Sequence, residues 1–196
     1  MINFSKISKY IKISGVEEIV RRYFAMNGFD GILTILGVII GMHMSNLHNP
    51  SLIILTSLST SVAVGISGFS GTYMTEKAER IKKIKKLERA MLTKLKKTIV
   101  EEAAKFAYFY AAFVAGISPL IFSTAILTPF LLTSFNFSDY FTSFYVSLGI
   151  AFTLLFLLGV YLGKISEENI IIWGLKMFLI GLITSFLISL IGLTFK

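Results

Sequence analysis

Apolar residues along this chain of 196 residues gather in five long runs that are separated by short polar segments. Each run is close to or above the roughly 20 residues that an α-helix needs to cross the hydrocarbon core of a bilayer. Continuous runs indicate helices, because transmembrane barrels are built from short strands of alternating polarity. The pattern therefore predicts an all-α membrane protein with five transmembrane helices, at approximately residues 26–46, 51–75, 103–127, 140–162 and 170–193.

Two segments outside these runs mix apolar and basic residues at helical spacing. Residues 1–25 are typical of an amphipathic helix lying on a membrane surface, and Gly15 is expected to break it before a second short stretch. Residues 76–100 are strongly basic, with ten Lys or Arg between Lys77 and Lys97, yet they keep an apolar helical rhythm and contain no Pro or Gly. We expect an N-terminal interfacial helix, and a basic helix that continues the second span.

The composition restricts the class of protein further. The chain is 55% hydrophobic and 15% charged, with a mean hydropathy of +0.77, and a soluble protein of this size could not bury so much apolar surface. It has no cysteine, which excludes disulfides, thiolate metal sites and iron–sulfur clusters within the chain. No nucleophile–base pair or nucleotide-binding loop is visible, so we do not expect an enzyme.

The net charge is +8, and the basic residues are concentrated in alternate connections between the spans. The N-terminal segment, residues 76–100 and the short connection 163–169 contain basic residues, whereas 45–50 and 133–139 contain none. The positive-inside rule then predicts a cytoplasmic N-terminus and a C-terminus outside or in a lumen, in the plasma membrane if the source is a prokaryote. The basic helix either anchors anionic lipid or only sets this topology. It lacks interleaved aromatic residues, so nucleic-acid binding is not expected.

Asp30 is the residue of greatest functional interest. It lies in the apolar run 29–44, in which the only other ionisable residue is His43. An ionisable group inside a span is costly and usually faces the protein interior or a wet cavity. With the amide of Asn27, Asp30 could hold a hard divalent cation, or it could carry a proton. The alternative is a helix N-cap at the membrane interface.

The second span is rich in hydroxyl and small residues. Its hydroxyls could complete the shell of a bound cation; the candidates are Thr60, Ser61, Ser67, Ser70, Thr72 and Tyr73. Small residues at steps of three or four allow another helix to approach closely. Such sets are Gly65 with Gly68 and Gly71, Gly37 with Gly41, and Gly159 with Gly163.

Several stretches in order resemble the vacuolar iron transporter family. They are Asp30–Gly41 (DGILTILGVIIG), Tyr73–Glu79 (YMTEKAE), Gly116–Pro119 (GISP), Ser147–Gly159 and Gly174–Gly181. The resemblance implies a homodimer that exports ferrous iron or manganese from the cytoplasm in exchange for protons, with no permanently bound cofactor. The pathway would lie between two protomers, lined by spans one and two, and Asp30 matches a transport residue of that family.

The chain also departs from that family at three places. The family usually has a Glu early in span two and a Met two turns later, where this chain has approximately Thr60 and Gly68. The family's long Glu-rich cytoplasmic insertion is replaced by the short basic segment, which repels divalent cations. The alternative function is therefore a non-transporting membrane protein whose basic helix binds anionic lipid or a protein partner.

Two further clusters could serve a transport path. Near the cytoplasmic end, a cation entrance could be formed by Glu76, Glu79, Glu101 and Glu102. These carboxylates could equally pair with the neighbouring Lys77, Arg80, Lys97 and Lys105. At the outer end of span one, a release site for a soft or borderline ion could be formed by Met42, His43, Met44 and His48. The alternative there is simple packing of the methionines and solvated histidines.

Overall fold

The computed structural model describes residues 4–95, 98–135 and 137–194, with only the backbone for residues 4–8. The described chain is all-α. Its helices are α1 (Phe4–Ser14), α2 (Val16–Met44), α3 (Pro50–Met91), α4 (Ile99–Ser134), α5 (Tyr140–Ile165) and α6 (Ile170–Thr194). Helices α2 to α6 are long and apolar enough to cross a membrane, which confirms the predicted fold class with five candidate spans.

The helix boundaries follow local chemistry rather than the limits of the apolar runs. Gly15 has φ 59°, a left-handed conformation that glycine adopts without strain, and it separates α1 from α2 as predicted. Helix α2 begins at Val16, so the predicted second short stretch is its first turns. Helix α3 continues into the basic segment without a break, but it ends at Met91, before the predicted limit at residue 100. Residues 96 and 97, within that predicted helix, lie outside the described residues.

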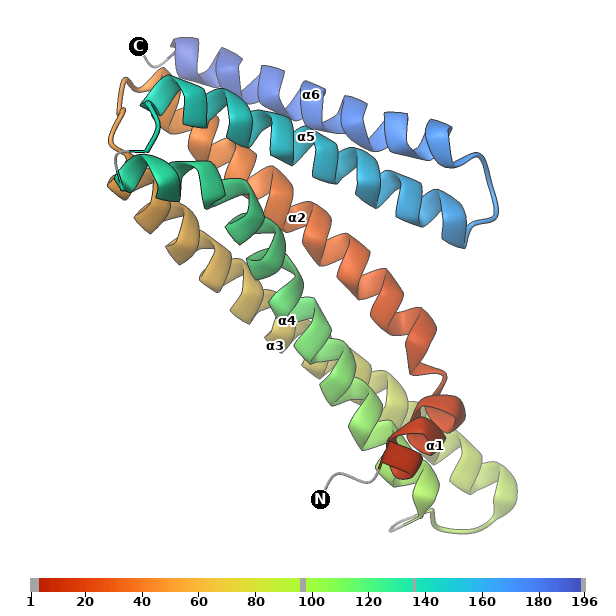
Figure 1. The fold of residues 1–196 in the computed structure, drawn as a ribbon. Coiled ribbons are helices and arrows are strands. Elements are labelled where there is room, and N and C mark those ends of the chain that lie inside the picture. Colours follow the sequence, from red (N-terminus) through yellow and green to blue (C-terminus); the bar gives the residue numbers. More distant parts are fainter. Residues whose placement is uncertain (1–3, 96–97, 136, 195–196) are drawn as a thin grey trace.

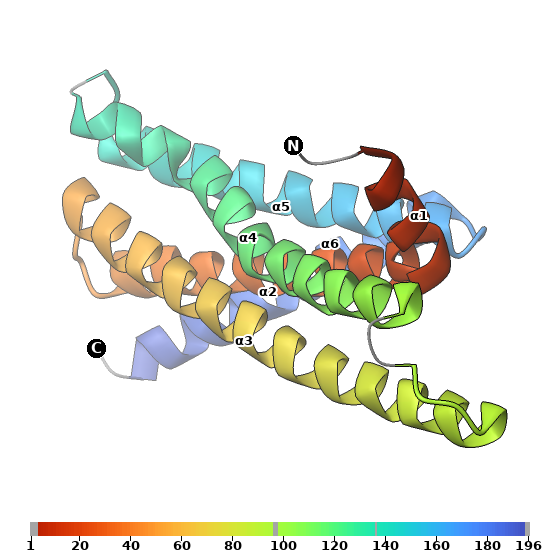
Figure 2. The same cartoon turned by 90° about the horizontal axis from the view of Figure 1, so that it is seen from below.

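The helices form two hairpins that diverge from one end, with α2 between them (Figure 1). One hairpin is α3–α4 and the other is α5–α6, and α4 contacts α1, α2, α3 and α5. The turns after α2 and α4 lie at the closed end, whereas α1, the turn after α3 and the turn after α5 lie at the diverging end (Figure 1). The basic C-terminal part of α3 runs beyond the bundle at that end (Figure 2).

Small residues set the close contacts between helices. A Cβ added at Gly31 of α2 would lie 2.7 Å from Cα of Pro119, and one at Gly65 of α3 would lie 2.7 Å from the carbonyl oxygen of Gly116. In the second hairpin a Cβ at Gly159 would lie 2.5 Å from the Trp173 carbonyl oxygen, and Gly163 also packs against α6. The predicted role of Gly159 and Gly163 in helix contact is therefore confirmed. Of the α3 glycines, Gly65 and Gly68 lie in such contacts, whereas nothing lies within 4 Å of a Cβ at Gly71.

Candidate functional site

Asp30 lies on the exposed face of α2, not inside the protomer. Its neighbours Gly28 and Gly31 pack against α4, and these contacts fix the rotation of α2 so that Asp30 points away from α4. The Asp30 backbone carbonyl accepts a hydrogen bond from Thr34 Oγ1 at 2.7 Å. Within the described part of the chain, the Asp30 carboxylate itself has no hydrogen bond or ion pair. An ionisable group is thus exposed on a candidate membrane span, an arrangement that is costly in a bilayer unless something covers it.

Asn27 is buried where α2 meets α3. Its Nδ2 donates to the carbonyl oxygen of Tyr23 at 3.0 Å. Its Oδ1 lies so close to Gly68 that a Cβ there would come to 2.6 Å. Asn27 is therefore buried against α3, whereas Asp30, three residues later and on the neighbouring part of the α2 surface, is exposed.

The hydroxyl candidates of α3 are buried, half-buried or exposed. Ser61 and Thr72 are buried, and the Ser61 hydroxyl donates to the Ser57 carbonyl oxygen. Thr60 is half-buried and donates to Thr56 O at 2.7 Å. Ser67 and the other exposed small residues form what we call the small-residue face of α3: Ser59, Ala63, Ser67, Ser70 and Gly71. Among the described residues nothing lies within 4 Å of a Cβ added at Gly71, so this face is accessible there.

The four predicted entrance glutamates have different environments. Glu76 is 7% exposed, accepts a hydrogen bond from the Tyr23 hydroxyl at 3.2 Å, and lies 3.7 Å from Arg22 and 3.8 Å from Arg80.

The other three lie nearer the surface. Glu101 pairs with Lys105 at 2.8 Å, Glu102 accepts a hydrogen bond from the Tyr10 hydroxyl, and Glu79 is exposed. Among the residues that the structure describes, no three Asp, Glu or His side chains are grouped so that they could hold a metal ion.

The histidines predicted at the outer end do come together. Rings of His43 and His48 have centroids 5.4 Å apart, and the hydroxyl of Tyr140 lies 3.2 Å from His43 Nδ1. His43 also stacks on Phe144, with a centroid separation of 4.1 Å.

The two methionines contact other residues. Met42 Sδ accepts a hydrogen bond from Thr56, and the Met44 side chain packs against Gly192 of α6. The structure therefore unites the two imidazoles with a phenol, and places both thioethers in helix contacts.

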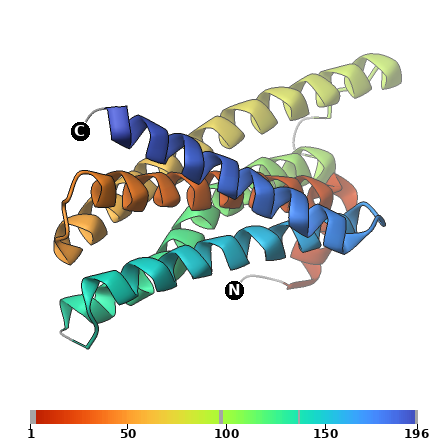
Figure 3. The ribbon, with the colours of Figure 1, turned by 90° about the horizontal axis from the view of Figure 1, so that it is seen from above.

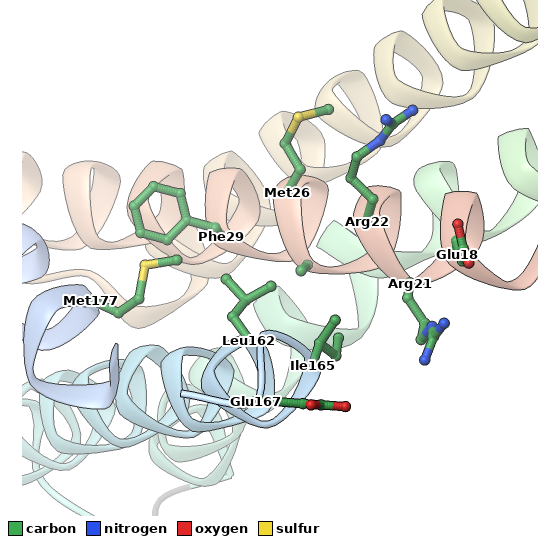
Figure 4. A pocket seen from close by; sticks show the side chains of 10 residues that line it. Glu18, Arg21, Arg22, Met26, Phe29, Leu162, Ile165, Glu167 and Met177 are labelled. Atoms are coloured by element: carbon green, nitrogen blue, oxygen red, sulfur yellow. The ribbon is translucent and has the colours of Figure 1, made fainter. Parts of the chain in front are cut away.

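An open cleft of about 800 Å³ lies at the diverging end, between α2 and the α5–α6 hairpin. Arg21 and Glu167 lie at one end of the cleft, and Phe29 and Met177 lie at the other (Figure 4). Met26, which precedes Asp30 by about one helical turn, also lines the cleft. The sequence did not predict this cleft, because it depends on how far the α5–α6 hairpin leans from α2.

Arg80 is a second feature that the sequence alone did not reveal. It is 9% exposed, and its Nη1 donates to the Ser14 carbonyl oxygen at 3.3 Å. Within the described chain, its Nε and Nη2 atoms are buried without a hydrogen-bond partner. Thr72, Glu76 and Arg80 are all buried and lie four residues apart, on one face of α3. In the sequence, the only sign of this arrangement is the regular spacing of the three polar residues.

Comparisons with known proteins place the chain among its relatives. No protein-family model matches it, and no solved structure matches it. The chain is similar to the uncharacterized protein MJ0645 of Methanocaldococcus jannaschii, with 36% identity over 159 residues that cover 80% of each chain. The chain is thus an integral membrane protein of five candidate spans that belongs to the family of MJ0645.

Proposed function

We propose that this protein is a homodimeric transporter that exports a divalent cation, ferrous iron or manganese, from the cytoplasm in exchange for protons. The observation that carries the proposal is the Asp30 carboxylate, which lies exposed on an apolar span with no partner among the described residues. A carboxylate in this position is retained at a cost in free energy, and such residues typically mark ion pathways. It also fits the resemblance to the vacuolar iron transporter family.

The same face of the protomer is suited to a second copy of the chain. Helix α3 packs beside α2, and Figure 3 shows the bundle from the side on which α6 lies over α2. The small-residue face of α3 would let a second backbone approach closely, and Gly41 of α2 also has nothing within 4 Å of an added Cβ. A dimer through α2 and α3 would remove Asp30 from lipid and set it near its symmetry mate.

The chemistry of the proposed step requires few groups. Ionised Asp30 would bind the cation together with hydroxyls such as Ser67, since carboxylate and hydroxyl oxygens suit hard divalent ions. Protonation of Asp30 would release the ion, and two Asp30 side chains at one interface would titrate as a coupled pair. The cleft lined by Met26 and Phe29 would bring the cation from the diverging end to the part of α2 that carries Asp30, although Asp30 does not itself line the cleft.

The direction of transport rests on the distribution of charge. Basic residues of α1, of the α3 extension and of the α5–α6 turn lie at the diverging end (Figure 1). The positive-inside rule makes that end cytoplasmic. The cation would therefore enter from the cleft and leave near His43 and His48.

The test is flux of Mn²⁺ and Fe²⁺ in proteoliposomes under an imposed pH gradient. The wild-type protein should move the ion, and Asp30→Asn should reduce flux to background. Asp139→Asn is the matched control, because Asp139 is the other aspartate of the chain and is exposed at the start of α5. Equal flux in wild type and Asp30→Asn would remove Asp30 from the mechanism.

A second candidate is a membrane protein that transports nothing and whose basic helix binds anionic lipid or a protein partner. It is favoured by the engagement of Glu76, Glu101 and Glu102 with neighbouring side chains, which leaves little acidic surface to attract a cation. Absence of flux for every divalent ion tested, in protein that is folded and correctly inserted, would favour this function.

A further inference from the structure

A separate pocket of about 240 Å³ lies between the basic part of α3 and the start of α4. Its basic residues are Lys77, Arg80, Lys85 and Lys105. Its apolar wall includes Ile81, Ile84 and Leu95. A pocket that combines several cations with an apolar wall matches a ligand that carries both an anion and a hydrocarbon part.

Arg80 provides the most specific element of this pocket. Its side chain is only 10% exposed, and its Nε lies 3.8 Å from Glu76 Oε2. Neither Nε nor Nη2 makes a hydrogen bond within the described chain, and Nη2 has no ion pair there either. Buried polar groups without partners are uncommon, and each costs free energy that a ligand would recover. The planar donors of arginine are well suited to phosphate oxygens.

Three carboxylates lie near these cations, and Glu76, 3.8 Å from Arg80 Nε, is one of them. Glu101 is paired with Lys105 at 2.8 Å. Glu88 Oε1 accepts the backbone N–H of Leu95 at 2.8 Å, where it closes the turn after α3. Four cations thus face three carboxylates, and Lys77 and Lys85 form no ion pair among the described residues, so the positive surplus lies at these two lysines.

The position of the pocket coincides with the edge of the apolar runs. On α3 the residues from 51 to 75 contain no charged side chain, and on α4 none occurs from 106 to 134. Lys77 and Lys105 are therefore among the first charges after two membrane-spanning stretches, at the depth where lipid headgroups lie.

We propose that this pocket binds the phosphate group of an anionic phospholipid, with Arg80 as its buried ligand, Lys77 and Lys85 at its rim, and the lipid's apolar part against Ile81 and Ile84. The site does not depend on cation transport, and it is a defined pocket rather than a diffuse attraction of the basic helix to a charged surface.

The experiment measures binding of phosphatidylglycerol to the detergent-purified full chain by native mass spectrometry, with phosphatidylcholine and inorganic phosphate as comparisons. Lys77→Gln/Lys85→Gln removes two rim charges and should weaken phosphatidylglycerol binding about tenfold. Lys82→Gln/Arg89→Gln is the matched control, because it removes the same charge from α3 outside this pocket and should leave affinity unchanged. Arg80→Gln should lose binding at least as strongly as the lysine pair.

The outcomes separate the possibilities. Weaker phosphatidylglycerol binding by Lys77→Gln/Lys85→Gln, with unchanged binding by the control pair, supports the site. This result stands even if Arg80→Gln fails to fold, which could happen because Arg80 also contacts Glu76 and Ser14. Equal loss in both charge pairs overturns the proposal in favour of diffuse attraction. Folded Arg80→Gln with full affinity also overturns it. Binding of inorganic phosphate that excludes phosphatidylglycerol overturns the assignment to a lipid.

Discussion

Gly31 of α2 lies against Pro119 of α4 with backbone in contact with backbone. A Cβ at residue 31 would come to 2.7 Å from Cα of Pro119 and 3.2 Å from its carbonyl oxygen. Pro119 lies inside α4 and has no N–H, so the local helix geometry differs from that of a regular helix. The contact holds α2 in one rotation, and this rotation turns the adjacent Asp30 outward.

The first prediction concerns this contact. Gly31→Ala should lower the free energy of unfolding by about 2 kcal/mol, because neither backbone can move aside for the extra methyl group. The measurement is unfolding of the purified protein in mixed micelles, followed by circular dichroism. Gly149→Ala is the control, since nothing lies within 4 Å of a Cβ there, and it should leave stability unchanged or slightly raised. Equal stability of the two variants would contradict the contact.

The fold could be predicted from the sequence because the apolar runs are long and are separated by turns. The break at Gly15 and the packing of Gly159 and Gly163 could be predicted as well, since both follow from the lack of a side chain. The start of α2 could not be predicted from the apolar run, because a helix can extend beyond its membrane-spanning part until a helix-breaking residue ends it. Residues from Val16 onward contain no such stop, so helix and apolar run have different limits.

The candidate sites were less predictable, because they depend on contacts between distant residues. Asp30 could be selected by its charge, but its outward direction depends on Gly31 and Pro119. Arg80 lies in a basic segment that would be expected to be solvated throughout, and its burial depends on α1 lying near enough for Ser14 to accept its hydrogen bond. The proximity of His43 and His48 to Tyr140 requires the turns after α2 and α4 to meet.

The second prediction concerns the buried Glu76. Its carboxylate lies between the guanidinium groups of Arg22 and Arg80. Glu76→Gln would leave Arg80 buried without its opposite charge, and should cost about 3 kcal/mol of stability. Glu79→Gln, an exposed change of the same chemistry three residues away, should stay within about 0.5 kcal/mol of wild type. Similar unfolding curves for both variants would show that the ion pairs of Glu76 with Arg22 and Arg80 do not stabilise the fold.

The third prediction is a pH dependence of the contact between α1 and α4. The hydrogen bond that Tyr10 donates to Glu102, at 2.6 Å, raises the pKa of the Tyr10 phenol above 10.0, because ionisation would break the bond and place two negative charges together. The pKa is higher in the folded state than in the unfolded state. The contact is therefore fully stabilising below pH 10 and is lost as the pH rises through the raised value.

An alkaline absorbance titration measures this shift. Subtracting the curve of Tyr10→Phe from that of the wild type isolates Tyr10, and its midpoint should lie above pH 10.0. The same subtraction in a Glu102→Gln background should give a midpoint closer to 10.0. An unchanged midpoint after removal of Glu102 would exclude the carboxylate as the cause.

The fourth prediction tests the dimer separately from transport. The chain has no cysteine, so a single engineered thiol reports its own surroundings. Ser67→Cys places a thiol on the small-residue face of α3, where two protomers would meet. Mild oxidation of native membranes should then give a disulfide-linked dimer on a non-reducing gel.

Thr153→Cys is the matched control for this cross-linking, because it also replaces an exposed hydroxyl within a span but lies on α5 and not on the small-residue face of α3. It should remain monomeric under the same oxidation. Random collisions in the membrane would link both variants to the same extent, and that result would contradict the proposed interface. If Ser67→Cys alone is linked while Asp30→Asn still carries full flux, the dimer stands and the role of Asp30 does not, because packing of the small-residue face does not require the carboxylate.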